Sequence, residues 1–238
     1  MAALVSSLLA FALSCAVAGA AALVPVPSLK PSLPVAGLEP NRGQAEAEIL
    51  FLSRGIPSLA VTAQSVLYSP LGVRLSLLAS NPNPAVRFAD PLPGLVNSFT
   101  GADAQKWVTG IPRYATAHLA EVYPGIDGQY AIGADGQSTL KLLFRPGIDP
   151  KPVAFEIAQA LSIVRNSDGS VLARLGISRY DPTLIYVAPL AFQETASGRV
   201  SRSVRFEVQS TTRFGFLVEG RDIQPRITTE TSCDTKTL

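Results

Sequence analysis

Short runs of residues with a two-residue hydrophobic period recur along the chain from Ile49 onward and predict β-strands. The clearest run is 73–77, where apolar and polar residues alternate as they do in a strand with one buried face. Glycine and proline separate the runs at intervals of about 8–12 residues, which is the spacing of an antiparallel sandwich or barrel. Further runs of this kind lie at residues 49–52, 59–62, 66–68, 129–132, 140–144, 161–164, 171–175 and 204–208.

Two Asp-Gly sequences predict hairpin turns, at Asn166–Ser170 and at Ala134–Gln137, because Asp-Gly supplies the positive φ angles of a tight turn. Helical periodicity is restricted to single turns expected at 102–106 and 119–122. In the stretch 92–155, Pro-Gly and Gly-rich phrases predict turns between short strands. We therefore predict an all-β fold, an antiparallel β-sandwich of Greek-key or jelly-roll type with short helical turns.

The first residues carry the features of an export signal. An apolar run covers 4–17, and the small residues at 18–22 predict cleavage after Ala20 or Ala22, which defines a signal peptide at 1–22. No lysine or arginine precedes the run, so two alternatives stay open. One is an uncleaved anchor, which requires about 20 apolar residues. The other is a lipoprotein signal at Cys15.

The rest of the chain divides into three predicted segments. Residues 23–38 are rich in proline and predict an extended linker. Residues 39–227 supply the strands of the sandwich, and one domain of this length is ordinary. Residues 228–238 are polar and predict a flexible tail with an exposed Cys233, because little apolar surface offsets the entropy of ordering them. The expected location is secreted or cell-surface.

Composition narrows the possible partners. The chain carries a net charge of +2 without a basic block, so we expect neither nucleic acid nor membrane binding beyond the signal segment. We expect no metal, because His118 is the only histidine and no cysteine pair accompanies it. We expect no cofactor, because the chain has no glycine-rich phosphate loop and no dinucleotide fingerprint.

A series of phrases in a fixed order resembles a known family. They are Glu39–Gln44, Phe51–Gly55, Asp90–Asn97, Lys106-Trp107, Ile111–Tyr114, Val122–Asp127, Phe144–Pro150 and Ala188–Glu194. Together they resemble a domain of unknown function in bacterial secreted and cell-surface proteins, where it usually precedes SBBP-type β-propeller repeats. That family has no established catalytic residues. No propeller repeats follow here, so we expect a free-standing version, a truncated gene or a fragment.

Four residues are candidates for a structural or binding role. Arg42 is suited to bind a carboxylate or sugar acid, and alternatively to pair with Glu39 or Asp127. Tyr123 opens a Pro-Gly turn in which Gly125 needs a positive φ. Asp127 is expected to accept backbone N–H groups of that turn, with a general acid or calcium ligand as alternatives.

Trp107, the only tryptophan, is the fourth candidate. It suits stacking on a sugar when exposed, and is expected instead as a core anchor whose indole N–H finds a carbonyl. His118 is expected at the surface or rim of the fold.

From these observations we predict a non-catalytic extracellular or cell-surface module with a structural or binding role. Its expected partner is a surface glycan or another cell-envelope protein. The alternative is a carbohydrate-active module, which either binds a glycan or hydrolyses it weakly. Hydrolysis would require two carboxylates about 5–9.5 Å apart in a cleft.

Overall fold

The computed structural model describes residues 36–54, 58–69, 71–133, 137–149, 151, 153–176 and 182–218, and the backbone of 227–234. All of them belong to one compact unit, which runs from Pro34 to Leu238. The predicted signal peptide, 1–22, and the predicted linker up to residue 35 lie outside the described residues.

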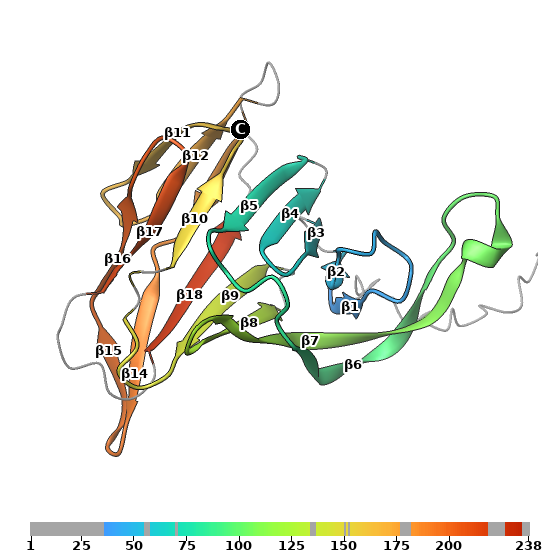
Figure 1. The fold of residues 1–238 in the computed structure, drawn as a ribbon, viewed down its shortest axis with the longest axis horizontal. Helices are drawn as coiled ribbons and strands as arrows, with labels where there is room; N and C mark the ends of the chain where they lie inside the picture. The colour runs from blue at the N-terminus through green and yellow to red at the C-terminus, as the bar shows by residue number, and fades with distance from the viewer. Residues whose placement is uncertain are drawn as a thin grey trace, which may run out of the picture. The chain divides into compact units, whose positions relative to one another are not determined.

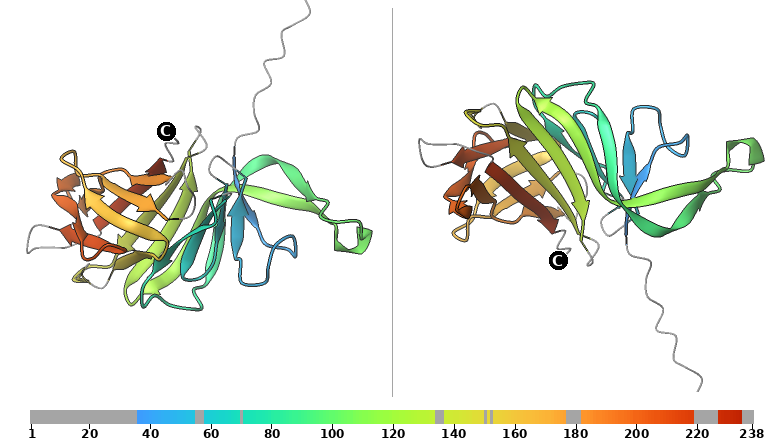
Figure 2. Two further views of the ribbon diagram at one scale, coloured as in Figure 1. Left: turned by 90° about the horizontal axis from the view of Figure 1, so that it is seen from above. Right: turned by 90° about the horizontal axis from the view of Figure 1, so that it is seen from below.

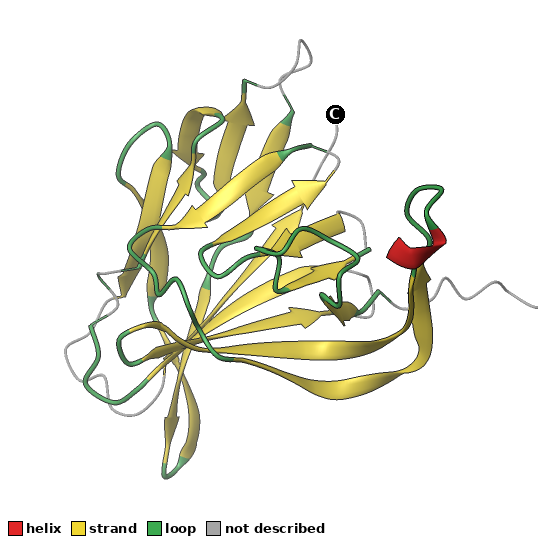
Figure 3. Ribbon diagram, turned by 45° about the vertical axis from the view of Figure 1, so that its right-hand side comes forward, coloured by secondary structure: helices red, strands yellow, loops and turns green. Residues whose placement is uncertain are grey.

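The described part of the chain is built of antiparallel β-strands with a single short helical turn (Figures 1 and 3). The elements are β1 Leu38–Pro40, β2 Phe51–Ser53, β3 Ser58–Val61, β4 Ser65–Ser69, β5 Val73–Leu77, β6 Val86–Ser98, η1 Ala104–Lys106, β7 Val108–Tyr123, β8 Ile126–Ile132, β9 Ser138–Phe144, β10 Ala154–Ile157, β11 Ala160–Arg165, β12 Val171–Leu175, β13 Thr183–Tyr186, β14 Leu190–Thr195, β15 Gly198–Arg202, β16 Val204–Val208, β17 Arg213–Val218 and β18 Ile227–Asp234.

Non-sequential pairings join the first and last parts of the chain. Strands β1 to β5 form a meander, and β5 pairs with β10, which leads to β17 and β16. At the other end of the meander, β1 pairs with β7 at Leu38 and Tyr114. Strand β7 pairs with β8, β8 with β9 and β9 with β18. Strand β18 in turn pairs with β14 and β13. Strands distant in sequence therefore lie side by side (Figure 2).

The core forms because most strands bury every second side chain. Burial alternates along β5, β8 and β12, as expected for sheets with one face on the core. The buried side chains of the early and the late strands form one hydrophobic cluster. Its late half is rich in aromatic rings, where Phe155 stacks on Phe214 at 5.3 Å and Phe206 packs edge-on against Phe214 at 5.4 Å. The predicted all-β antiparallel sandwich class is confirmed.

Several local predictions are confirmed and others are wrong. The runs 73–77, 171–175 and 204–208 coincide with β5, β12 and β16, and the Asp-Gly sequence after Arg165 joins β11 to β12. The second Asp-Gly, at 135–136, lies outside the described residues, between the paired strands β8 and β9. The helical turn predicted at 102–106 is found at Ala104–Lys106, whereas 119–122 belongs to β7.

The predicted flexible tail is wrong for residues 228–234, whose backbone forms most of β18. The register pairs Thr228–Ser232 with β9, Ile227–Glu230 with β14 and Cys233-Asp234 with β13. A polar segment is ordered here because neighbouring strands on both sides satisfy its backbone N–H and C=O groups. Residues 235–238 lie outside the described residues.

Candidate functional site

The longest feature of the described fold is the hairpin of β6 and β7, whose outer part, residues 92–113, we call the arm. It extends away from the other strands (Figures 1 and 2). The sequence predicted turns here, at Leu92–Gly94 and Thr109–Pro112. Instead, these residues lie within the strands, and the register shifts between Leu92 and Leu95. Gly94 and Gly110 have φ of 82° and 69°, so the predicted turns are bulges that bend a continuous ribbon.

Aromatic packing fixes the base of this hairpin to the core. Phe88 of β6 lies edge-on to Phe51 at 5.8 Å between ring centroids, and Tyr114 of β7 packs on Phe88 at 5.2 Å. Phe51 is fully buried and also contacts Tyr130 at 5.4 Å. The arm therefore starts from a rigid base.

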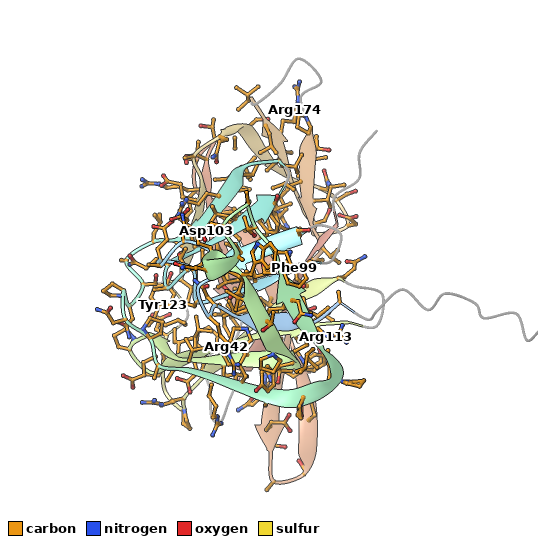
Figure 4. The ribbon with its side chains drawn as sticks, turned by 90° about the vertical axis from the view of Figure 1, so that its right-hand side faces the viewer. Arg42, Phe99, Asp103, Arg113, Tyr123 and Arg174 are labelled. Atoms are coloured by element: carbon orange, nitrogen blue, oxygen red, sulfur yellow. The ribbon has the colours of Figure 1, made fainter. Side chains whose placement is uncertain are left out.

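The outer end of the arm exposes apolar side chains. Phe99 and Trp107 face each other across the hairpin, edge to face at 5.2 Å, and are 61% and 44% exposed. The Trp107 indole N–H donates to the Gly101 carbonyl at 3.2 Å, and Asp103 caps η1 by accepting from Gln105 N at 3.0 Å. Figure 4 shows Phe99 and Asp103 at this end. The expectation of a core tryptophan is thus wrong, although its N–H does find a carbonyl.

The size of this apolar surface limits what it can do alone. Leu95 on the arm is 67% exposed. Leu95 lies nearer the base, so at the arm end Phe99 and Trp107 alone expose apolar surface, on the order of 200 Å². A stable protein interface buries about 800 Å² per partner. The arm end is therefore large enough to anchor a contact, but too small to be the whole of one.

A cleft of about 360 Å³ lies at the base of the arm, between it and β1. Glu39, Arg54, Leu95, Val96 and Arg113 line it. The Glu39 carboxylate is buried and accepts a hydrogen bond from Arg54 Nε at 3.1 Å, while the Arg54 side chain stays 53% exposed. Arg113 donates through Nη2 to the Pro93 carbonyl, at the bulge of β6. The cleft thus combines two arginines with aliphatic side chains.

The structure places Arg42 outside this cleft, and both of its predicted partners lie beside other arginines. Glu39 pairs with Arg54, and Asp127 lies near Arg145 Nη2 at 3.8 Å. Arg42 is exposed in a loop that its neighbours hold together. The Asn41 amide donates to three carbonyls, including Glu46 O at 2.8 Å, and Gln44 Nε2 donates to Pro40 O at 2.7 Å. The polar side chains of this phrase therefore stabilise the loop.

Tyr123 and Asp127 also stabilise the fold locally. The Tyr123 hydroxyl donates to Leu78 O at 3.0 Å, and burial raises its pKa to about 12, which the hydrogen bond to Ala154 opposes. Asp127 Oδ1 accepts from the backbone N–H of Glu121 at 2.7 Å. That N–H belongs to a bulge before the turn rather than to the turn itself, and Glu121 has φ of 51°. Gly125 has the positive φ, 75°, that the predicted turn requires.

The remaining titratable groups do not gather at one point. His118 is half-buried and lies 3.3 Å from the Gln129 amide across β7 and β8, which fits the predicted rim position. A wider cleft of about 630 Å³ is lined by Glu48 and Glu156. Each of these carboxylates is in an ion pair with an arginine, Arg74 at 3.7 Å and Arg213 at 2.8 Å.

Clusters of metal-ligating side chains and long apolar helices were both sought among the described residues. No group of three or more His, Cys, Asp and Glu side chains is positioned there to hold a metal ion. Of the residues that the structure describes, none forms a helix long and apolar enough to span a bilayer.

Fold and surface together define an all-β domain with an extended arm, whose end carries two exposed aromatic side chains, and with a cleft lined by two arginines. Residues 38–228 match the family model described as a domain of unknown function (DUF7948), and the chain belongs to this family. No curated protein and no solved structure matches it.

The sequence interpretation missed Phe99, Leu95, Arg54 and Arg113. A signal was present for Phe99, because Phe99 and Trp107 bracket a turn-rich loop at 100–106. Arg54 and Arg113 stand in two of the phrases that carry the family resemblance, but nothing in either phrase indicates that they line one cleft.

Proposed function

We propose that this protein is a non-catalytic binding module of the bacterial cell surface that attaches to an envelope partner through its arm. The observation that carries the proposal is the exposed aromatic pair Phe99 and Trp107 at the arm end. Aromatic side chains anchor interfaces because they bury a large apolar area with little loss of rotamer freedom. The internal bonds at Gly101 and Asp103 hold the arm end in one conformation, which lowers the entropic cost of binding.

The hydrogen bonds of the polar side chains in the family phrases support a non-catalytic role. Asn41, Gln44 and Asp127 all bond to backbone atoms, and Glu39 bonds to Arg54. These side chains stand in the phrases that give the chain its family resemblance. Their bonds shape loops and bulges, so the phrases are explained by the needs of the fold without a reaction.

The binding test compares the full chain with an arm variant. A Gram-negative envelope fraction is incubated with the fluorescently labelled protein, and co-sedimentation is measured. Phe99→Ser with Trp107→Ser should reduce binding at least tenfold. Leu161→Ser is the matched control, because Leu161 on β11 is also an exposed leucine, at 57%, away from the arm. Equal binding by the double variant, or no sedimentation of the natural chain, would refute the proposal.

Exposed Trp107 also favours a second candidate, glycan binding by stacking of a sugar ring on the indole. The indole N–H is already bonded, so the ring offers a ligand only its apolar surface. A glycan array probed with the purified domain tests this, with Trp107→Phe and Trp107→Ala as variants. Binding that survives in the first and is lost in the second indicates stacking, and an array without signal contradicts it.

Export is part of the same proposal. Expressed in a Gram-negative host, the chain should leave the cytoplasm and lose its first 20 or 22 residues, as the segment 1–22 predicts. N-terminal sequencing of the exported product checks this. A membrane-bound product that retains Met1 or Ala2 would favour an anchor instead. A link to propeller repeats stays a prediction of the family resemblance.

A further inference from the structure

We propose that the wider cleft, on the outer face of β4, β5 and β10, binds a neutral oligosaccharide. This inference goes beyond the proposed function, because none of the lining residues of this cleft belongs to the arm. The cleft has a volume of about 630 Å³, within the range of about 300–1,000 Å³ that is typical of ligand sites. Its lining consists mainly of small and polar side chains.

Strand pairing places a row of polar side chains on the floor of the cleft. Strands β4, β5 and β10 lie side by side (Figure 1), with Ser65 opposite Ser76 and Ser76 opposite Glu156. Directly opposed residues of an antiparallel pair have Cβ atoms about 4.5–5.5 Å apart, so these three side chains are immediate neighbours. They face away from the core, because Leu75 and Leu77 on either side of Ser76 are buried in it.

The charges of the cleft are balanced, which suits an uncharged ligand. Glu156 Oε1 accepts a hydrogen bond from Arg213 Nε at 2.8 Å, and Glu48 Oε1 lies 3.7 Å from Arg74 Nη2. Each of these contacts uses one carboxylate oxygen, so the second oxygen is able to accept a hydrogen bond from a ligand hydroxyl. Hydrogen bonds to an ionised acceptor are about twice as strong as those between neutral groups.

The cleft also offers polar side chains that the fold does not use. Among the described residues, neither the Ser76 hydroxyl nor the Asn83 side-chain amide has a hydrogen-bond partner. Both groups donate as well as accept. By contrast, Ser65 Oγ lies 2.8 Å from Thr62 Oγ1 and accepts from Arg74 Nη1 at 2.8 Å, which holds this arginine in place. Free donors and acceptors therefore stand beside fixed ones, as the hydroxyls of a sugar require.

The two loops that wall the cleft are fixed before a ligand arrives. The loop after β5 turns at Ala79, whose φ of 54° is uncommon for a residue with a Cβ. Gln64 Nε2 donates to Ser80 O at 2.6 Å and holds this turn against β4. In the loop before β2, Asn41 Nδ2 donates to Ile49 O at 2.9 Å. Walls that are already ordered lower the entropic cost of binding.

The floor of the cleft favours a glycan over a peptide. Strand β5 pairs with β4 on one side and with β10 on the other, so its backbone N–H and C=O groups are already bonded. A peptide therefore cannot bind here by adding a strand to a sheet edge. A sugar is bound through side chains instead, and the C–H groups of its ring can pack on Leu50 and Pro82.

An array of neutral oligosaccharides tests the proposal. The fluorescently labelled full chain is applied to short oligomers of glucose, galactose, mannose and N-acetylglucosamine, with acidic oligosaccharides on the same array. At least one neutral oligomer should retain the protein, and its affinity is then measured by calorimetry. Raising the salt concentration should leave this affinity unchanged, because the ligand carries no charge. An array without a neutral ligand, or binding that salt abolishes, overturns the proposal.

Two conservative variants locate the site. Ser76→Val removes the hydroxyl from the floor, and Glu156→Gln removes the charge of the acceptor but keeps its shape. Each should weaken binding of the neutral oligomer by about tenfold or more. Ser162→Val is the matched control for the first, because Ser162 is also a half-buried strand serine but lies on β11 outside the cleft. Glu194→Gln is the control for the second, because Glu194 pairs with Arg199 Nε at 3.0 Å on an exposed hairpin.

Each outcome decides the proposal. Thermal unfolding verifies the fold of every variant, and Asn83→Ala on the exposed loop replaces a cleft variant that fails to fold. Full binding by the cleft variants overturns the proposal, and a signal lost only in Trp107→Ala assigns the glycan to the arm end instead. If the array is empty while envelope binding still depends on Phe99 and Trp107, only the cleft proposal fails. If the cleft binds the oligomer and the arm-end variant sediments normally with envelopes, the arm-end function fails and the cleft proposal holds.

Discussion

Replacement of Gly125 by alanine tests the strongest local constraint in this fold. Gly125 lies in the Tyr123–Ile126 turn between β7 and β8 with φ of 75°, a region that costs a residue with a Cβ about 1–2 kcal/mol. A Cβ there would lie 2.6 Å from Ile148 Cδ1 and 2.7 Å from Ile148 Cγ1. These distances are far below the contact distance of about 3.5–4.0 Å between carbon atoms.

The clash cannot be relieved cheaply. Ile148 is packed against the hydrophobic core, and a β-branched side chain has few χ1 rotamers to move to. Overpacking of this kind costs about 1–3 kcal/mol. Added to the backbone term, Gly125→Ala should lower the free energy of unfolding by about 2–5 kcal/mol, and Tm by on the order of 10 °C.

The chain supplies its own control. Gly147 stands in a second Pro-Gly turn, where Ile148 N donates to Arg145 O at 3.2 Å, and its φ is 80°. No atom lies within 4 Å of a Cβ added at Gly147. Gly147→Ala therefore carries the backbone cost without the clash, and should destabilise by only about 1–2 kcal/mol.

Urea unfolding separates the backbone cost from the cost of the clash. The variants compared are Gly125→Ala, Gly147→Ala, Ile148→Ala and the double variant Gly125→Ala with Ile148→Ala. Truncation of Ile148 removes the obstacle, so the double variant should be more stable than the sum of the single effects by about 1–3 kcal/mol. Equal losses in the two glycine variants, or strict additivity in the cycle, would show that the contact between the two turns does not constrain Gly125.

Three further predictions concern the rest of the fold. Deletion of 227–238 should lower Tm by more than about 10 °C, because β9, β13 and β14 lose a partner strand. Deletion of 235–238 is the control and should leave Tm unchanged. Equal melting curves for the two deletions would contradict the pairing of β18. Burial raises the pKa of Tyr123 to about 12, above the unfolded value of 10. The contribution of the neutral Tyr123 hydroxyl to the free energy of unfolding is therefore complete below pH 10 and is lost between pH 10 and 12. Urea unfolding should show this loss, which Tyr123→Phe should reduce, and a stability constant up to pH 12 would refute it. Asn41→Ala should cost about 1–3 kcal/mol, because five hydrogen bonds hold its loop, whereas Arg42→Ala should change stability by less than about 0.5 kcal/mol; similar thermal shifts would contradict this.

Strands with one buried face could be predicted from sequence, because the core imposes the two-residue period on them. Val73–Leu77 and Val171–Leu175 are examples whose bounds match. Strand β6 could not be predicted in this way, because of its side chains only Ser98 is buried, and Pro91, Pro93 and Gly94 lie within it. Without a buried face there is no alternation, and the same residues that make turns elsewhere make bulges in an exposed ribbon.

Strand β18 escaped prediction for a related reason. Its sequence, Ile227–Asp234, is rich in threonine and poor in large apolar residues, so composition indicated a tail. Threonine has a high β propensity, but the strand is specified mainly by partners that are distant in sequence, from β9 to β14. Trp107 was misplaced because a lone tryptophan is a core residue only where a core exists, and the arm has none.

The cleft illustrates how a site arises that no single phrase encodes. Glu39, Arg54 and Arg113 meet because Leu38 pairs with both Ser53 and Tyr114, so a three-residue strand sets all three positions. This close approach depends on the preceding Gly37, where a Cβ would lie 2.9 Å from Leu92 Cδ1 and 3.2 Å from Arg113 Cβ. A missing side chain thus lets β1 approach the arm, and the buried charge of Glu39 then requires Arg54 as its partner. Residues from separate sequence phrases, none of which indicates a site alone, are thus brought together by the register of the paired strands.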